Sequence, residues 1–129
     1  MCLDAVDTKP TTRKRVGYKV FIQEDDGSIR GLFHGPLEGW ETGKWIKDKM
    51  IAQLSSLHST STYPTGFHVF CNYRDAKLLA GDNPNHIVRK VRVRKIVASG
   101  SQGIRVRPRC YTDVPIVVCC EILIEGESL

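Results

Sequence analysis

Three basic residues alternate along one apolar segment and could bind phosphate groups. Lys90, Arg92 and Arg94 are spaced two residues apart, so in a β-strand their side chains point to one face, each about 7 Å from the next. Val91 and Val93 then point to the other face, as a core requires. Successive phosphates of a nucleic-acid strand lie a similar distance apart. The pattern therefore predicts a site for an anionic ligand, either a nucleotide or a nucleic acid.

A second basic group follows in the chain. Arg105 and Arg107, with a further arginine two residues on, alternate after the sequence SGSQG at 99–103, which is typical of a turn. If the two segments pair, six cations share one surface, and like charges that face each other across strands destabilise a sheet. A bound anion would relieve this repulsion. Alternatively, Glu121 and Glu125 of the last strand would neutralise the cations, which would then form a purely structural surface.

A histidine and several aromatic residues could complete the site. His68 lies in the apolar stretch GFHVF, on the same side of the strand as Phe70; it could donate to a ligand phosphate or be a hydrogen-bonded structural residue. Tyr73 and Trp45 could stack on a base beside the cations. The predicted ligand-binding residues are His68, Lys90, Arg92, Arg94, Arg105, Arg107, Tyr73 and Trp45.

The cysteines give weaker signals. Cys2 would become an N-terminal thiol nucleophile if Met1 were removed, and His68, Cys71 and Cys110 could supply zinc ligands. Neither the P-loop motif nor the dinucleotide-binding glycine motif occurs in the sequence. We therefore predict no catalytic residue, no cofactor and no metal site.

The composition is that of a cytoplasmic protein with one domain. The chain has 129 residues, a formal net charge of +5 and five cysteines without C-x-x-C spacing, which fits a reducing compartment. Its N-terminus lacks the apolar run of a signal peptide, and no apolar run is long enough to span a membrane. We expect a flexible N-terminal arm at 1–15 and a single domain at 16–129.

Hydrophobic periodicity predicts a hairpin near the start and an ambiguous segment after it. Residues 16–22 alternate, EDDGS turns, and IRGLF returns as the second strand. Apolar residues in 44–57 recur at helical spacing, which favours a helix, although Trp45 and Ile46 could instead belong to a strand.

The second half of the chain gives clearer signals. GFHVF is a short strand, and a helix follows at 73–80, with Asn72 as its N-cap and Gly81 just past its end. Residues 86–98 form the longest strand, and PIVVCCEILIEGE forms the last one. The predicted fold class is α+β, a mainly antiparallel sheet with one or two short helices packed on it.

The motifs also carry a resemblance to a known group. GYKVF, the W-x-x-G-K-W element that ends at Trp45, GFHVFCNYRDA and VRKVRV follow one another over 16–98. In this outline the chain resembles small phage and prophage proteins of unknown function, although that group often has an acidic residue in place of Lys90. The resemblance implies a phage origin, a bacterial host cell and a strand at Trp45–Ile46, and it implies no activity.

A looser resemblance is to ADP-ribosyltransferase folds, in which a G-x-H strand precedes a helix. It implies an NAD-using enzyme, with Glu121 or Glu125 as the catalytic glutamate.

The expected function is capture of a phosphate-bearing ligand without catalysis. One version is a phage protein that sequesters a nucleotide signal of bacterial anti-phage defence. A nucleic-acid-binding module, an inhibitor of a host protein and the NAD-using enzyme are the alternatives, and a pocket between two copies of the chain is left open. No membrane partner is expected.

Overall fold

The computed structural model describes residues 3–7, 13–31, 40–47, 53–55, 62–64 and 66–128. These residues form a mostly antiparallel sheet with one short helix, so the predicted α+β class is confirmed. The strands are β1 (Ala5–Val6), β2 (Val16–Gln23), β3 (Ile29–Gly31), β4 (Trp45–Lys47), β5 (Gln53–Ser55), β6 (Thr62–Pro64), β7 (Phe67–Phe70), β8 (His86–Arg107) and β9 (Cys110–Ser128); the helix is α1 (Tyr73–Ala80).

One long hairpin organises the sheet. The strands β8 and β9 pair along most of their length, and three register shifts let the hairpin curve. On one side β8 pairs with β2, on the other β9 pairs with β7, and β2 and β7 meet where Tyr18 lies opposite Phe70. The four strands therefore close into a ring. The short strands β1, β3 and β4 extend it at β8, β2 and β9, while β5 and β6 form a separate pair.

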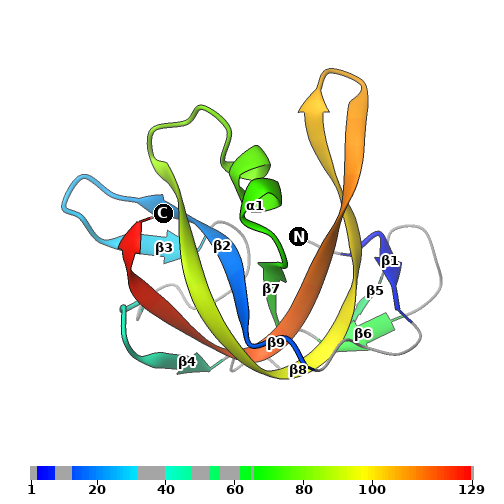
Figure 1. Ribbon diagram of the computed structural model, residues 1–129, viewed down its shortest axis with the longest axis horizontal. Helices are drawn as coiled ribbons and strands as arrows, with labels where there is room; N and C mark the ends of the chain where they lie inside the picture. Colours follow the sequence, from blue (N-terminus) through cyan, green and yellow to red (C-terminus); the bar gives the residue numbers. More distant parts are fainter. Residues whose placement is uncertain are drawn as a thin grey trace.

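Side chains alternate between the two faces of each strand, so the buried apolar residues form two clusters. Phe67 and Val69 of β7 belong to one buried cluster, together with Phe21 and Val91. Phe70 belongs to the other, which lies on the opposite face and contains the buried residues of α1. Figure 1 shows the helix in the hollow of the curved hairpin. Each face of the sheet is thus covered over part of its length.

The helix begins and ends where the sequence predicts. Asn72 precedes it with extended backbone angles, but its side chain donates to the Asp75 carboxylate at 3.1 Å and makes no bond to a helix amide. Gly81 follows with φ 60°, and its N–H donates to the Lys77 carbonyl. Ala76 and Ala80 are buried, because small side chains let the helix approach the sheet closely. This helix is the longest one described, and it is too short to cross a membrane.

The helix predicted over 44–57 is wrong where the structure describes it. Residues 45–47 form β4, which pairs with β9, and residues 53–55 form β5. The strand at Trp45–Ile46 that the resemblance implied is therefore confirmed. Apolar spacing in a short segment cannot distinguish a helix from an edge strand, and pairing with β9 decided between them. Residues 48–52 lie outside the described part.

The predicted turn at 99–103 is also wrong. The strand β8 continues through these residues, and the chain turns at Pro108 and Arg109. Gly100 allows the backbone of β1 to approach β8 closely, since a Cβ at this position would collide with the Ala5 carbonyl.

The contact between β1 and β8 also positions part of the N-terminal arm that was predicted at 1–15. Ala5 and Val6 pair with β8, and Leu3 has no exposed surface. Of the predicted arm at 1–15, residues 3–7 thus lie against the sheet, and residues 8–12 lie outside the described part.

Candidate functional site

The three alternating cations lie together on β8, as the sequence predicts. Lys90, Arg92 and Arg94 share one face, with 39%, 63% and 45% of their side chains exposed. They have the same alternation as Val88, which packs against the α1 side of the sheet. Because the helix covers only that end of the strand, the cations beyond it face solvent.

Two carboxylates of β9 lie between the cations. Glu125 is 3.2 Å from Arg92 and 4.0 Å from Lys90, while Glu121 is 2.9 Å from Arg94. The sequence left open whether a bound anion or these glutamates relieve the repulsion, and the structure shows that both glutamates contact the basic group. Without them, neighbouring cations would repel one another on the folded sheet.

The Glu121 carboxylate binds two consecutive cations. Its second oxygen lies 2.9 Å from the Lys95 amine, and its side chain is only 3% exposed. Lys95 has φ 58°, close to the register shift between Ile96 and Ala98, and its amine reaches the same carboxylate as Arg94. Hydrogen bonds from Lys95 and then Arg94 hold the Glu121 pKa below its usual value. Lys95 was not among the predicted residues, because regular strand alternation would point it away from the face of Arg94.

Trp45 lies beside these cations, and one of them already packs over its ring. Its strand pairs with β9, which places Trp45 opposite Leu123 and Lys47 opposite Glu121. The Arg94 guanidinium lies 3.8 Å from the centroid of the Trp45 ring. Arg94 thus reaches across β9, and a cation–π contact and the Glu121 ion pair hold it in place.

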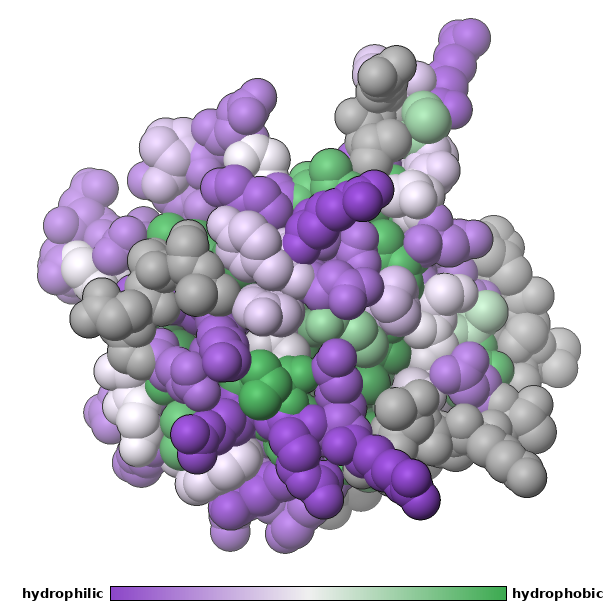
Figure 2. Space-filling view, viewed as in Figure 1, coloured by the Kyte–Doolittle hydropathy of each residue, from purple (hydrophilic) through white to green (hydrophobic). Residues whose placement is uncertain are grey.

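The result is a surface with a net positive charge, here called the basic sheet surface. It consists of Lys47, Lys90, Arg92, Arg94 and Lys95 around Glu121 and Glu125. Figure 2 shows strongly hydrophilic residues gathered along the lower edge of the molecule, over the bend of the β8–β9 hairpin. Its cations outnumber its carboxylates, and the carboxylates are the less exposed groups.

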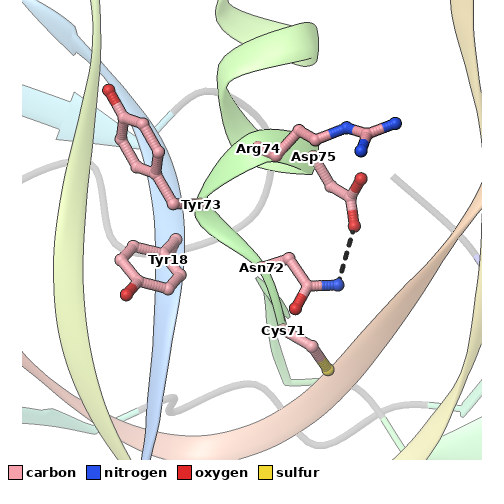
Figure 3. Close-up of a pocket in the computed structure, with 6 residues that line it drawn as sticks. All are labelled: Tyr18, Cys71, Asn72, Tyr73, Arg74 and Asp75. Atoms are coloured by element: carbon pink, nitrogen blue, oxygen red, sulfur yellow. Dashed lines mark hydrogen bonds between the residues drawn. The ribbon is translucent and has the colours of Figure 1, made fainter.

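A pocket that is open to solvent, of about 590 Å³, lies at the start of α1. Figure 3 shows the rings of Tyr18 and Tyr73 on one side of the helix start and the Arg74 and Asp75 side chains on the other. The two rings pack edge to face, 5.8 Å apart, and Tyr73 is 37% exposed. Tyr18 lies directly opposite Lys90 in the sheet, so the aromatic pair adjoins the basic sheet surface.

Cys71, which also lines this pocket, has no sign of activation. Its side chain is partly buried, and burial raises the pKa of the thiol. A thiol with a raised pKa is a poor nucleophile at neutral pH.

His68 does not lie on the basic sheet surface; it is a buried structural residue, 2% exposed. Its Nδ1 is 3.1 Å from the Gly66 carbonyl and its Nε2 is 3.1 Å from the Tyr63 hydroxyl. A carbonyl only accepts, so Nδ1 carries the proton, and in the neutral ring Nε2 accepts from Tyr63. The Tyr63 oxygen in turn accepts the Leu3 N–H at 2.7 Å. Through the Tyr63 hydroxyl, His68 thus helps hold the N-terminal segment in place.

The predicted surface of six cations does not form. Arg105 is exposed but lies near the far end of the hairpin, opposite Tyr111. Arg107 pairs with Cys110 there, and its side chain is outside the described set. The six cations stay apart because the chain does not turn at 99–103. The strand β8 continues through these residues, so Arg105 and Arg107 lie far along it from Lys90.

The described geometry gives little support to a zinc site or to a catalytic role for Glu121. Among the described residues no three His, Cys, Asp or Glu side chains lie close enough to hold a metal ion. Cys2 lies outside the described part. Glu121, a candidate catalytic glutamate, has both carboxylate oxygens in ion pairs.

Comparison with known proteins found no family model, no curated protein and no solved structure that matches this chain.

Proposed function

We propose that the protein binds the phosphodiester backbone of a nucleic acid through the basic sheet surface. The observation that carries the proposal is the row of exposed cations at phosphate spacing on an open sheet face. Because the cations form a row and not a closed cluster, the face suits a chain of phosphates better than a single small anion. Neutralisation of successive phosphates by Lys and Arg releases counterions, which supplies most of the affinity in such complexes.

Ordering of the side chains supports the same proposal. Glu121 and the Trp45 ring hold the Arg94 guanidinium, and Glu121 also holds the Lys95 amine. Less side-chain freedom is then lost when phosphates bind. Arg92 and Lys95 remain 63% and 67% exposed, so they can exchange part of their contact with a carboxylate for a contact with phosphate.

The test measures affinity for a labelled single-stranded oligonucleotide over a range of salt concentrations by fluorescence anisotropy. Arg92→Ser/Lys95→Ser should lower affinity about tenfold at low salt and reduce the slope of log K against log salt by about 0.7 per lost contact. Both side chains are exposed, so the fold should be retained.

Arg30→Ser/Lys77→Ser is the matched control. It removes two exposed cations from β3 and α1, and we expect affinity close to that of the wild type. A wild-type affinity that does not change with salt, or an equal loss in both double variants, would exclude the basic sheet surface as the binding site.

A narrower form of the proposal is capture of a free nucleotide, such as a signal of anti-phage defence. The observation that favours it is the open pocket, where Tyr73 could stack on a base while Lys90, opposite Tyr18, contacts the phosphate. Under this form, calorimetry with cyclic dinucleotides and ADP-ribose derivatives gives binding heat that Tyr73→Ala removes, whereas oligonucleotide affinity stays low. Absence of heat with the whole panel would contradict it.

A further inference from the structure

The far end of the β8–β9 hairpin forms a second basic element, here called the hairpin arm (residues 104–112). Its two strands pair Ile104 with Thr112, Arg105 with Tyr111, and Arg107 with Cys110. Pro108 and Arg109 make the turn, and Arg109 has φ 62°. Figure 1 shows the arm rising away from the rest of the sheet, past the helix. The arm is therefore a narrow two-stranded ribbon with solvent around its tip.

The arm has a strong positive charge, and the nearest described carboxylates, Asp4 and Asp113, lie at its base beside Gly103 and not along it. Its sequence, IRVRPRCYT, contains three arginines and no acidic residue. Arg105 and Arg109 are exposed, and within the described part of the chain neither forms an ion pair. Tyr111 is 66% exposed although it is a large aromatic residue. The arginines of the basic sheet surface differ, since they contact Glu121 and Glu125.

The arm and the basic sheet surface are separate sites. Lys95 and Arg105 belong to the same strand, and ten residues of β-strand span up to roughly 30 Å. In Figure 1 the arm rises on the far side of the bend at which the hairpin turns upward. The bend of the hairpin therefore separates the two surfaces.

We propose that the hairpin arm enters the major groove of double-stranded DNA. This groove is about 12 Å wide and admits a two-stranded β-ribbon, and the exposed arginines of the arm complement the phosphates on both groove walls. The exposed Tyr111 lies on the same face as Arg105 and can contact base edges. The major groove of duplex RNA is deep and narrow, which excludes a ribbon. The inference rests on the proposed function for the ligand class and identifies duplex DNA within that class.

The test compares affinities for a DNA duplex, an RNA duplex of the same sequence and single-stranded DNA at one salt concentration. Arg105→Ser/Arg109→Ser should lower affinity for the DNA duplex at least tenfold and leave affinity for the other two within about twofold. Arg92→Ser/Lys95→Ser should lower all three affinities. Arg30→Ser/Lys77→Ser controls for net charge, and unchanged melting temperatures show that each variant is folded.

The outcomes separate the two proposals. If the arm variant binds the DNA duplex like the wild type, or loses affinity for all three probes equally, the arm is not a groove-binding element, while the basic sheet surface stands. If the wild type binds single-stranded DNA but no DNA duplex, the arm inference alone is overturned. If the wild type binds none of the probes, the proposed function fails as well.

Discussion

Lys19 has an unusual environment for a lysine, since charged side chains are rarely buried. Its side chain shares a face with Phe21 and is 7% exposed, and its amine donates to the His68 carbonyl at 3.1 Å. Burial lowers the pKa of the amine from 10.5 to about 8, and the nearby Cys119 raises it slightly. Below this pKa the folded protein carries a buried positive charge, which opposes folding.

Lys19→Met should therefore change how stability depends on pH. Between pH 8 and 10.5 the folded wild type has lost the Lys19 proton while the unfolded chain keeps it, so the unfolded state binds more protons and wild-type stability rises with pH. The variant lacks this contribution. Urea unfolding across this window should show the wild type gaining about 3 kcal/mol relative to the variant. Parallel stability curves would show that the Lys19 amine is solvated.

At the scale of elements, the attachment of β1 to β8 depends on a glycine. Asp4 donates its N–H to the Ser101 carbonyl and Asp7 donates to the Ser99 carbonyl, both at 2.9 Å. Gly100 lies between these bonds, where any Cβ would collide with the backbone of β1. The Leu3–Tyr63–His68 hydrogen bonds fasten the same segment from its other end.

Gly100→Ala should displace β1 without unfolding the ring of strands. We expect hydrogen exchange at the Asp4 and Asp7 amides to accelerate at least tenfold, because both bonds need the close approach. Ser101→Ala is the matched control, since it keeps the backbone bonds and adds no atom. Exchange at the amides of β2 should stay slow in both variants. Unchanged protection of Asp4 and Asp7 in Gly100→Ala would contradict the close approach.

At the scale of the whole molecule, the curved hairpin holds two basic surfaces apart. One lies at the bend of the hairpin and the other at its tip, and the helix fills the hollow between them (Figure 1). The hairpin is continuous from one to the other and is paired along most of its length. One paired hairpin thus connects the two surfaces, and under the two proposals made above one molecule contacts two separate segments of nucleic acid.

A single protein molecule should therefore bridge two DNA duplexes. Energy transfer between donor-labelled and acceptor-labelled duplexes should appear when protein is added and disappear with excess protein, because each duplex then binds its own molecule. Either Arg105→Ser/Arg109→Ser or Arg92→Ser/Lys95→Ser should abolish the transfer. Transfer that persists in both variants would require a bridging route other than these two surfaces.

Local signals in the sequence determined much of the architecture. The limits of α1, its glycine end, the first hairpin and the alternation of Lys90, Arg92 and Arg94 follow from patterns within a few residues. The two glutamates of β9 were one of the two expected ways to offset the cations, because like charges that face each other across strands repel.

The tertiary structure decided whatever depends on which strands meet. From the sequence, Gly100 suggests a turn, whereas in the structure it makes room for the backbone of β1. Because β8 continues past Gly100, Arg105 lies on the hairpin arm and not on the basic sheet surface. The Tyr63 hydroxyl and the Gly66 carbonyl give His68 its structural role. Lys95 joins Glu121 at a residue with positive φ. Local preference is set by neighbouring residues in the chain, whereas strand pairing and burial are set by partners far apart in it. The sequence therefore determined which residues could bind anions, and the curvature of one hairpin divided them between two surfaces.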